Sequence, residues 1–366
     1  MTEEQKIARR DWAKYSLAAA AGLVVGGAIG YVAKPAEVVP GGVVTKTETL
    51  TTTVTGGAAP TKAKKYTFYV VDHGEPGNAF WAVCYRGLKD AVDLLGGEVE
   101  MKHTYTAEDY KKQADNLKTA VDSNPDGILM TSPADPLLYD ATVREGVKKG
   151  IPFLTFNCDD PRPPEQRMPY MTYFGEAMFE SGTQLARDVI RYIAEHGTFK
   201  PKHALLGNPA AGHIIWETRL RTFGDVLNKE YGTKTTTFVL GVDPAKIPEM
   251  MRASLLENPD IDCIATFGWA IPLCAKVFSE VGKTPGKDLY IATFDPHPEV
   301  LDMIGNQTAI NAFDQQQYLQ GYLPIIMMYQ YKEHNFALFG TVCTGPFIIN
   351  EHNVATVIDQ SKKGYR

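Results

Sequence analysis

The chain has 366 residues, which is long enough for more than one hydrophobic core. Apolar residues make up 44% of it and charged residues 22%, so most of the chain is expected to be globular. The net charge of −6 argues against a nucleic-acid partner, because such proteins need a basic face to meet phosphates, whereas it sets no limit on a neutral ligand.

An uncharged, mainly apolar stretch runs from Tyr15 to Ala33, and Arg9, Arg10 and Lys14 lie before it. Basic residues ahead of an apolar stretch are typical of an export signal, or of a membrane helix whose N-terminus lies in the cytoplasm. The Arg pair is also similar to a twin-arginine export signal, and an ordinary basic leader is the alternative. We therefore predict that residues 1–34 are an export signal or a membrane anchor.

Residues 35–65 are rich in Thr, Gly, Val and Pro and contain few apolar residues that could anchor them to a core. This composition predicts a flexible stalk. A stalk is useful only to a domain that stays attached to a surface, so it favours a retained anchor. We expect the remaining chain to lie outside the cytoplasm, at the cell surface or in the periplasm, tethered by or exported through the N-terminal apolar segment.

From Tyr66 onward, short apolar runs alternate with amphipathic segments. The predicted strands are Tyr66–Val71, Glu98–His103, Gly127–Thr131, Pro152–Phe156, His203–Leu206, Thr236–Leu240, Cys263–Phe267 and Tyr290–Phe294. The predicted helices are Ala79–Leu95, Ala107–Ser123, Leu137–Lys149, Glu176–His196, Trp216–Tyr231, Ala245–Glu257, Ile271–Val281 and Glu299–Gly305. Strict alternation predicts an α/β protein with parallel sheets covered by helices on both faces. A break near Cys158–Pro169 divides the pattern into two series, which predicts two domains.

Ligands of open α/β sheets bind beyond the carboxyl ends of the strands. The side chains that we single out at or just after these ends, and at a final crossing over Ala312–Gln317, are Asn78, Phe80, Trp81, Asn157, Arg219, Trp269, Asp295 and Gln315. Amide, carboxylate and guanidinium groups bind neighbouring hydroxyls, and aromatic rings cover the apolar faces of sugar rings. The set therefore favours a sugar site, with ordinary helix caps and turn residues as the alternative.

Catalytic and cofactor motifs do not emerge from the sequence. Gly207–His213 has the glycine spacing of a phosphate-binding loop but lacks its Lys and Ser or Thr. The eight histidines are dispersed, and the five cysteines contain no closely spaced pair. We therefore predict no enzyme activity, no cofactor and no metal, and read His73 as a hydrogen-bonding loop residue.

Several short motifs at the strand ends carry a family resemblance. G-N-A-F-W (Gly77–Trp81) and A-T-F-D-P (Ala292–Pro296) resemble the N-P-F-F/W and G-F-D segments of the type I periplasmic sugar-binding proteins of the ribose/galactose group. R-L-R-T-F, from Arg219, is similar to that family's helix with a sugar-binding Arg, and F-D-Q-Q-Q (Phe313–Gln317) falls where the family has a Gln beside its hinge. The resemblance spans Tyr66 to about Asn353, and it implies that Asp295 binds a sugar hydroxyl.

Two segments depart from the family pattern. T-F-N-C-D has Asn157 and Cys158 in place of a strand-end Asp-Arg pair, and Gly268-Trp269 replaces an Asn-Asp pair. These departures remove charged or amide groups and add an aromatic ring. They indicate a ligand other than ribose itself.

The resemblance implies two Rossmann-like lobes that are joined by a three-stranded hinge and close on the ligand. Lobe one would comprise residues 66–172 and 315–342, and lobe two residues 173–314 and 343–360. Members of this family capture sugars for the permeases of ABC importers, so we expect a monomer with these partners, a small sugar or polyol and a permease. A membrane-anchored sensor of sugars, polyols or nucleosides is the alternative. A transcriptional repressor with the same fold would need a DNA-binding module where the apolar segment and stalk lie.

Overall fold

The computed structural model describes residues 65–366. The predicted export segment and all but the last residue of the predicted stalk lie outside these residues. Within 65–366, no helix combines the length and the apolar character that a membrane crossing requires.

The first of two six-stranded sheets is parallel throughout and has the order β11-β5-β4-β3-β1-β2. Its strands are β1 (Tyr66–Val71), β2 (Val99–Thr104), β3 (Gly127–Met130), β4 (Phe153–Phe156), β5 (Thr172–Glu176) and β11 (Gly340–Gly345). Apolar residues point to both faces, since Phe68 and Val70 pack in one core cluster and Val71 in the other. Such two-sided burial is what a helix-covered parallel sheet requires.

The second sheet has the order β12-β10-β9-β8-β6-β7, and only the β10–β12 pair is antiparallel. Its strands are β6 (His203–Asn208), β7 (Lys234–Val239), β8 (Cys263–Phe267), β9 (Tyr290–Phe294), β10 (Asn311–Asp314) and β12 (Phe347–Asn350). The two sheets with their helices have the α/β architecture that the sequence predicts.

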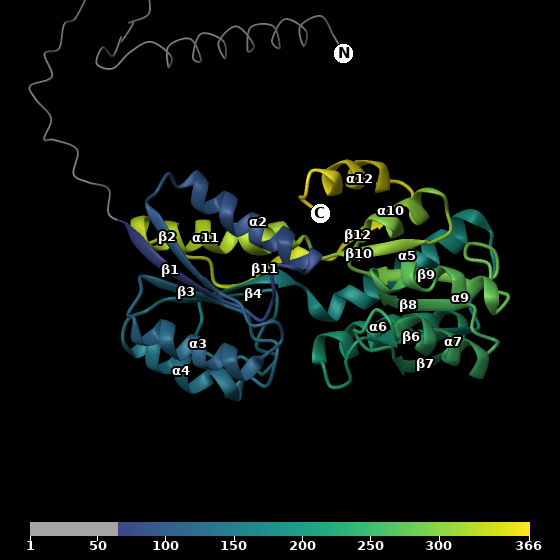
Figure 1. Ribbon diagram of the computed structural model, residues 1–366, viewed down its shortest axis with the longest axis horizontal. Helices are drawn as coiled ribbons and strands as arrows, with labels where there is room; N and C mark the ends of the chain where they lie inside the picture. Colours follow the sequence, from purple (N-terminus) through teal and green to yellow (C-terminus); the bar gives the residue numbers. More distant parts are fainter. Residues whose placement is uncertain (1–64) are drawn as a thin grey trace, which may run out of the picture. The chain divides into compact units, whose positions relative to one another are not determined.

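Helices cover both faces of each sheet. They are α2 (Ala79–Leu94), α3 (Tyr110–Asp122), α4 (Leu137–Lys148), α5 (Met178–His196), α6 (Ile214–Tyr231), α7 (Ile247–Glu257), α8 (Ala270–Leu273), α9 (Ala275–Glu280), α10 (Pro298–Gly305), α11 (Gln317–His334) and α12 (Val354–Lys362). Figure 1 shows α2 and α11 on one side of the first sheet and α3 and α4 on the other. On the second sheet, α5 and α6 share one core cluster, and α7 to α10 and α12 share the opposite one.

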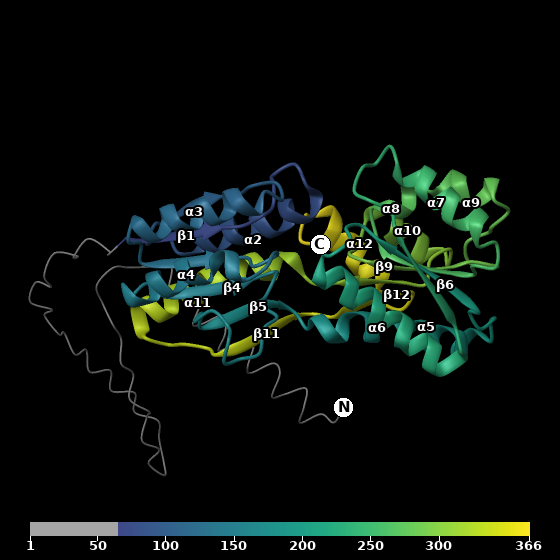
Figure 2. The same cartoon turned by 90° about the horizontal axis from the view of Figure 1, so that it is seen from below.

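The chain passes between the sheets at three places. It leaves β5 at Glu176 for α5, leaves β10 at Asp314 for α11, and runs from β11 to β12 through Gly345 and Pro346. The late strand β11 (yellow) therefore lies beside β5 (teal), although more than half of the described chain separates them in sequence (Figure 2). These three crossovers form the predicted three-stranded hinge.

Some predicted element boundaries differ from the structure. Glu176, expected at the start of a helix, is the last residue of strand β5. The expected helix Ile271–Val281 is divided into α8 and α9 at Cys274, whose backbone angles (φ −96°, ψ 0°) depart from those of a helix. Residues after α12 also return toward the first sheet, since Tyr365 packs against Tyr318 of α11 with 5.1 Å between ring centroids.

Helices α5 and α6 approach closely at Gly182. A Cβ atom at this position would lie 2.0 Å from the backbone oxygen of Arg219, so only glycine allows this contact. The close approach fixes the turn of α6 that carries Arg219 against the helix that follows the first crossover.

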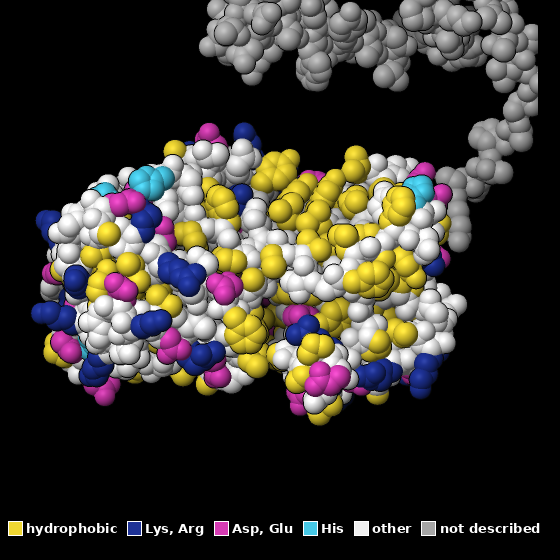
Figure 3. Space-filling model, turned by 180° about the vertical axis from the view of Figure 1, so that it is seen from behind, with side chains coloured by type: hydrophobic (Ala, Val, Ile, Leu, Met, Phe, Trp, Pro, Cys, Tyr) yellow, Lys and Arg dark blue, Asp and Glu magenta, His cyan; other side chains and the backbone are white. Residues whose placement is uncertain are grey.

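The surface carries mixed charges. On the face drawn in Figure 3, acidic and basic side chains are interspersed over the left half, and hydrophobic side chains gather over much of the right half. Several pairs are neighbours along one helix, such as Lys118 with Asp122 and Arg144 with Asp140. Exposed pairs of this kind contribute little to stability.

Candidate functional site

The loop after β1 holds three of the predicted ligand-binding residues. The side-chain oxygen of Asn78 accepts hydrogen bonds from the backbone N–H groups of Phe80 (2.9 Å) and Trp81 (3.4 Å), so it caps α2. Trp81 is only 5% exposed and packs in the core of the first sheet. Phe80 is half-buried, and its ring centroid lies 5.3 Å from that of Trp81. Phe80 is therefore the ring with free surface, and Asn78 keeps only its side-chain NH₂ group for a ligand.

Three buried amide side chains meet where β4 and β10 end. Asn157 follows β4 with φ of 62°, in the left-handed region that Asn adopts more readily than most residues. Its Nδ2 donates to Oε1 of Gln320 (3.1 Å) and of Gln315 (3.4 Å). Gln320 in turn donates from Nε2 to Oε1 of Gln315 (3.1 Å). The amides tie the first sheet to the second crossover.

Gln315 extends this arrangement to the end of β9. Its Nε2 donates to Oδ1 of Asp295 at 2.6 Å, and the Asp295 side chain is 19% exposed. Asp295 has φ of 65°, and a Cβ at position 268 would lie 2.1 Å from its backbone oxygen. Gly268 thus makes room for Asp295, which accounts for one departure from the family pattern. Burial raises the pKa of Asp295, although Arg219 and Gln315 oppose the rise.

Arg219 points from α6 toward the first crossover. Its Nε donates to Oε1 of Glu176 at 2.9 Å, and its Nη2 lies 2.7 Å from the same oxygen. Its Nη1 lies 3.9 Å from Oδ2 of Asp295. Aromatic rings flank the guanidinium, whose carbon lies 4.7 Å from the Trp216 ring centroid and 5.3 Å from that of Phe313. Burial by itself would lower the pKa of Arg219, but Glu176 and Asp295 outweigh it and raise that pKa.

These side chains form one connected set, which we call the polar network: Asn157, Gln320, Gln315, Asp295, Arg219 and Glu176. It holds fixed N–H donors and carboxylate and amide acceptors beside aromatic rings, as a site for hydroxyl groups requires. Four of the eight predicted site residues, Asn157, Arg219, Asp295 and Gln315, are brought together here.

The other four predicted residues lie outside the polar network. Trp269 is half-buried at the start of α8, and its ring centroid lies 4.6 Å from that of Phe267. Within residues 65–366, no hydrogen bond or ion pair joins Asn78, Phe80, Trp81 or Trp269 to the polar network.

Two histidines at strand ends are neutral near pH 7. His73 accepts or donates one hydrogen bond at Nδ1, 2.8 Å from Oγ1 of Thr131. Burial lowers the pKa of His73 to about 3, with a further contribution from His213. Burial and then Arg219 lower the pKa of His213 to about 4. Neither ring therefore adds a positive charge to the site.

Glu176 and Gln320 are the members of the polar network that the sequence analysis missed. The sequence pattern predicts Glu176 at the start of a helix, whereas in the structure it is the last residue of strand β5 (Thr172–Glu176). Reading the short apolar run Thr172–Gly175 as a strand would put Glu176 at a strand end. Gln320 lies one turn into α11, beyond the end of β10 and the crossing that follows it.

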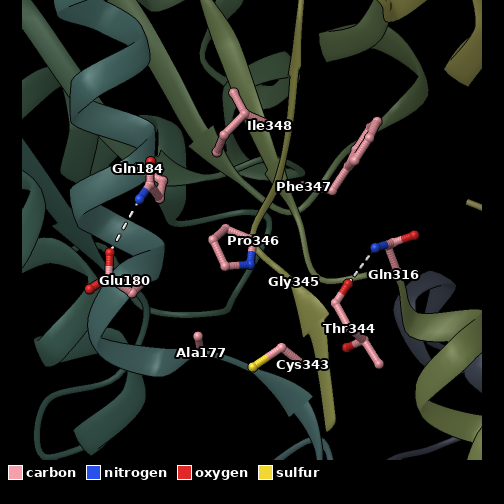
Figure 4. A pocket seen from close by; sticks show the side chains of 10 residues that line it. All are labelled: Ala177, Glu180, Gln184, Gln316, Cys343, Thr344, Gly345, Pro346, Phe347 and Ile348. Atoms are coloured by element: carbon pink, nitrogen blue, oxygen red, sulfur yellow. Dashed lines mark hydrogen bonds between the residues drawn. The ribbon is translucent and has the colours of Figure 1, made fainter.

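The three crossovers also line a shallow depression of about 470 Å³. Its lining comprises Ala177, Glu180, Gln184, Gln316, Cys343, Thr344, Gly345, Pro346, Phe347 and Ile348. Figure 4 shows the hydrogen bonds from Gln184 to Glu180 and from Gln316 to the Thr344 backbone at its walls. Only Gln316 and Ala177 adjoin network residues in sequence, so we treat the depression as part of the hinge surface.

One group within the described residues has metal-ligand spacing: Glu195, His196 and Glu351. Arg191 already neutralises it, since its Nη1 and Nη2 each donate to Glu351 at 3.0 Å. The group lies where α5 meets the β12–α12 turn and shares no residue with the polar network.

Comparison with known proteins identifies the family to which this architecture belongs. The family model of the periplasmic binding protein domain matches residues 71–335. A xylose/arabinose-binding protein of Sulfolobus acidocaldarius is 22% identical over 287 residues, which cover 76% of this chain and 69% of that protein.

Solved structures show the same fold. A carbohydrate transporter of Acidothermus cellulolyticus 11B in complex with myo-inositol is 26% identical, with a TM-score of 0.70 over 82% of this chain and 100% of that one. A solute-binding protein of Burkholderia graminis in complex with D-arabinose is 19% identical, with a TM-score of 0.68 over 81% of this chain and 99% of that one. A putative transcriptional regulator of Bacteroides fragilis is 17% identical, with a TM-score of 0.67 over 80% of this chain and 99% of that one. The fold by itself therefore does not distinguish a protein that captures a ligand for transport from one that regulates transcription. The family match covers most of the described residues, and the chain belongs to the family built on the periplasmic binding protein domain.

Proposed function

We propose that this protein captures a small polyhydroxylated ligand, with a monosaccharide as the first candidate, and delivers it to the permease of an ABC transporter. The observation that carries the proposal is the polar network, which joins strand ends of both sheets through Asn157, Gln315, Asp295 and Arg219. Relatives named for xylose, arabinose and myo-inositol binding support the ligand class.

The roles of the site residues follow from their surroundings. Asp295 accepts from ligand hydroxyls, and Arg219 donates from its free Nη1. Asn157 and Gln315 hold the crossover side of the site and bind hydroxyls when the ligand displaces their mutual contacts. Phe80 and Trp269 stack on the apolar face of the ligand, the side-chain NH₂ of Asn78 adds one donor, and Trp81 supports Phe80 from the core.

The lobes that close on the ligand are proposed to follow the two sheets. Lobe one holds residues 66–176 with 315–345, which extends both expected segments by a few residues to include the whole of β5 and β11. Lobe two holds 177–314 with 346–362. The three crossovers act as the hinge, since they are the places where few residues need to change backbone angles.

We further propose that the protein works as a monomer outside the cytoplasm, on a tether formed by residues 1–34 and the stalk. The charge pattern around the apolar stretch Tyr15–Ala33 supports this location. The xylose/arabinose-binding protein and the solute-binding protein reported above are named as binding proteins, and the polar network contains no nucleophile with an adjacent base, so we propose no catalysis.

A thermal-shift screen tests the proposal. The purified full-length protein is heated with D-xylose, L-arabinose, D-glucose, D-ribose, myo-inositol or adenosine, and sodium chloride serves as the control for ionic effects. A ligand at a hundred times its Kd stabilises the folded state by about 2.7 kcal/mol, which raises Tm by several degrees. A shift with a sugar or myo-inositol supports the proposal, a shift with adenosine alone assigns a nucleoside, and no shift with any compound at millimolar concentration overturns it.

A further inference from the structure

Glu176 ends strand β5 at the first crossover and is 2% exposed. Its hydrogen-bond partners within residues 65–366 are all donors. Arg219 donates from Nε to both carboxylate oxygens, at 2.9 and 3.2 Å, and its Nη2 lies at 2.7 Å. The hydroxyl of Ser181 donates to Oε2 at 2.7 Å. The carboxylate is thus held by two residues of the second half of the molecule.

The Glu176 contact occupies one whole edge of the Arg219 guanidinium. Rings of Trp216, Phe294 and Phe313 lie 4.7, 5.7 and 5.3 Å from its central carbon. Nη1 and the second N–H of Nη2 are left for another partner, and Asp295 lies beyond hydrogen-bond distance from Nη1 at 3.9 Å. Arg219 can therefore offer a ligand only its Nη1/Nη2 end, and its charge is already paired with the Glu176 carboxylate.

The charges of the polar network do not balance. Glu176 and Asp295 are two carboxylates, Arg219 is one guanidinium, and Asn157, Gln315 and Gln320 are neutral amides. The nearby rings of His73 and His213 are neutral because burial lowers their pKa values. An acidic ligand would meet an excess of negative charge, because the one guanidinium is already paired with Glu176.

We propose that Glu176 determines specificity by occupying and neutralising Arg219, so that the site accepts uncharged polyols and rejects sugar acids. This inference rests on the proposed function, because it concerns the same site. Glu176 acts through Arg219 and is a positioning residue, whereas Arg219 and Asp295 face the ligand.

Two pairs of sugars isolate the effect of one carboxylate. D-Glucuronate has the ring of D-xylose with a carboxylate at C5, and D-galacturonate is related to L-arabinose in the same way. Calorimetry with the full-length protein measures each affinity. The wild-type protein is expected to bind a neutral sugar at least tenfold more tightly than its acidic partner.

The variant Glu176→Gln keeps the size of the side chain and removes its charge. It is expected to weaken binding of the neutral sugar and to shift the ratio of affinities toward the acidic partner by roughly tenfold, since a like charge is removed and Arg219 is released. Glu180→Gln is the matched control, because Glu180 is an exposed carboxylate on the next turn and bonds Gln184 instead of Arg219. Its ratio should stay at the wild-type value.

The outcomes separate the two proposals. Equal losses for both members of a pair in Glu176→Gln would show a merely structural role and overturn the inference. If Glu176→Gln does not fold, the ratio of affinities measured with the wild-type protein still tests the inference. Tighter binding of the acidic sugar by the wild-type protein would overturn the inference. Failure of every neutral sugar and of myo-inositol to bind the wild-type protein would instead overturn the proposed function, and this inference with it.

Discussion

Gln315 donates a 2.6 Å hydrogen bond to Asp295 and so joins the second crossover to the end of β9. The same glutamine receives Asn157 and Gln320 at its oxygen, at 3.4 and 3.1 Å. One buried amide therefore relays contacts between strand ends of the two sheets. A rotation of one sheet relative to the other about the crossovers would change the hydrogen bonds of Gln315. The geometry of the surrounding site therefore depends on the hinge angle.

Asp295→Ala is expected to weaken sugar binding roughly tenfold or more, because a charge-assisted hydrogen bond contributes about 1.5–3 kcal/mol. The protein should remain folded, since Asp295 lies in a loop after β9 and outside the hydrophobic clusters. Calorimetry with the best ligand of the thermal-shift screen measures the change, and Asp302→Ala, an exposed carboxylate on α10, serves as the control. An unchanged Kd for Asp295→Ala would remove Asp295 from the site.

Phe80 and Trp81 are expected to respond differently to replacement by Ala. Trp81→Ala should lower the free energy of unfolding by about 3–5 kcal/mol, because a large ring leaves a well-packed core. Phe80→Ala should weaken ligand binding and leave the Tm of the ligand-free protein nearly unchanged. Urea unfolding and calorimetry on both variants make the comparison. Early melting of both variants with no change in affinity would mean that the loop is purely structural.

Acidification should destabilise the protein through His73. Its pKa in the folded state is about 3, below the ordinary 6.5, so the unfolded chain takes up the proton first as pH falls. Stability is complete above pH 6.5 and declines below it, by about 2 kcal/mol at pH 5 from this group. His73→Gln should therefore lose less stability than the wild type between pH 7.5 and pH 5 in urea titrations. An equal loss in both proteins, with exposed His334→Gln as the reference, would show that His73 is protonated when folded.

One thiol should react in the native protein. Cys84, Cys158, Cys263 and Cys274 are buried and Cys343 is exposed. Burial also raises the pKa of Cys274 to about 12, which further suppresses its thiolate. A maleimide should add one label per folded chain, five after unfolding, and none to folded Cys343→Ser. More than one label on the native wild type would mean that a core opens on the time scale of the reaction.

The alternation of strands and helices could be predicted because each segment carries its own periodicity. The run Tyr66–Val71 needs no knowledge of its neighbours to be recognised as a strand, and it is β1 in the structure. By contrast, β11 (Gly340–Gly345) is exposed over much of its length, and its pairing partner β5 lies far away in sequence. Tertiary pairing, rather than local propensity, makes this segment a strand.

The candidate site shows the same division. Asp295 and Asn157 were found because they directly follow recognisable strands. Glu176 follows a strand that the local pattern did not reveal, so its role was missed. Asn78 illustrates a different difficulty, because the same side-chain oxygen can cap a helix or meet a ligand, and both uses occur at strand ends. The sequence does not show which partner is present.

The exposed thiol of Cys343 lies beside the third crossover, in the depression lined by all three connections between the sheets. A fluorescent dye attached there would sit on the pivot and not in the ligand's path. Its emission would follow the angle between the two halves, and the native cysteine set already confines the dye to this position. The wild-type protein, labelled at Cys343, could therefore serve as a fluorescent sensor of its own ligand.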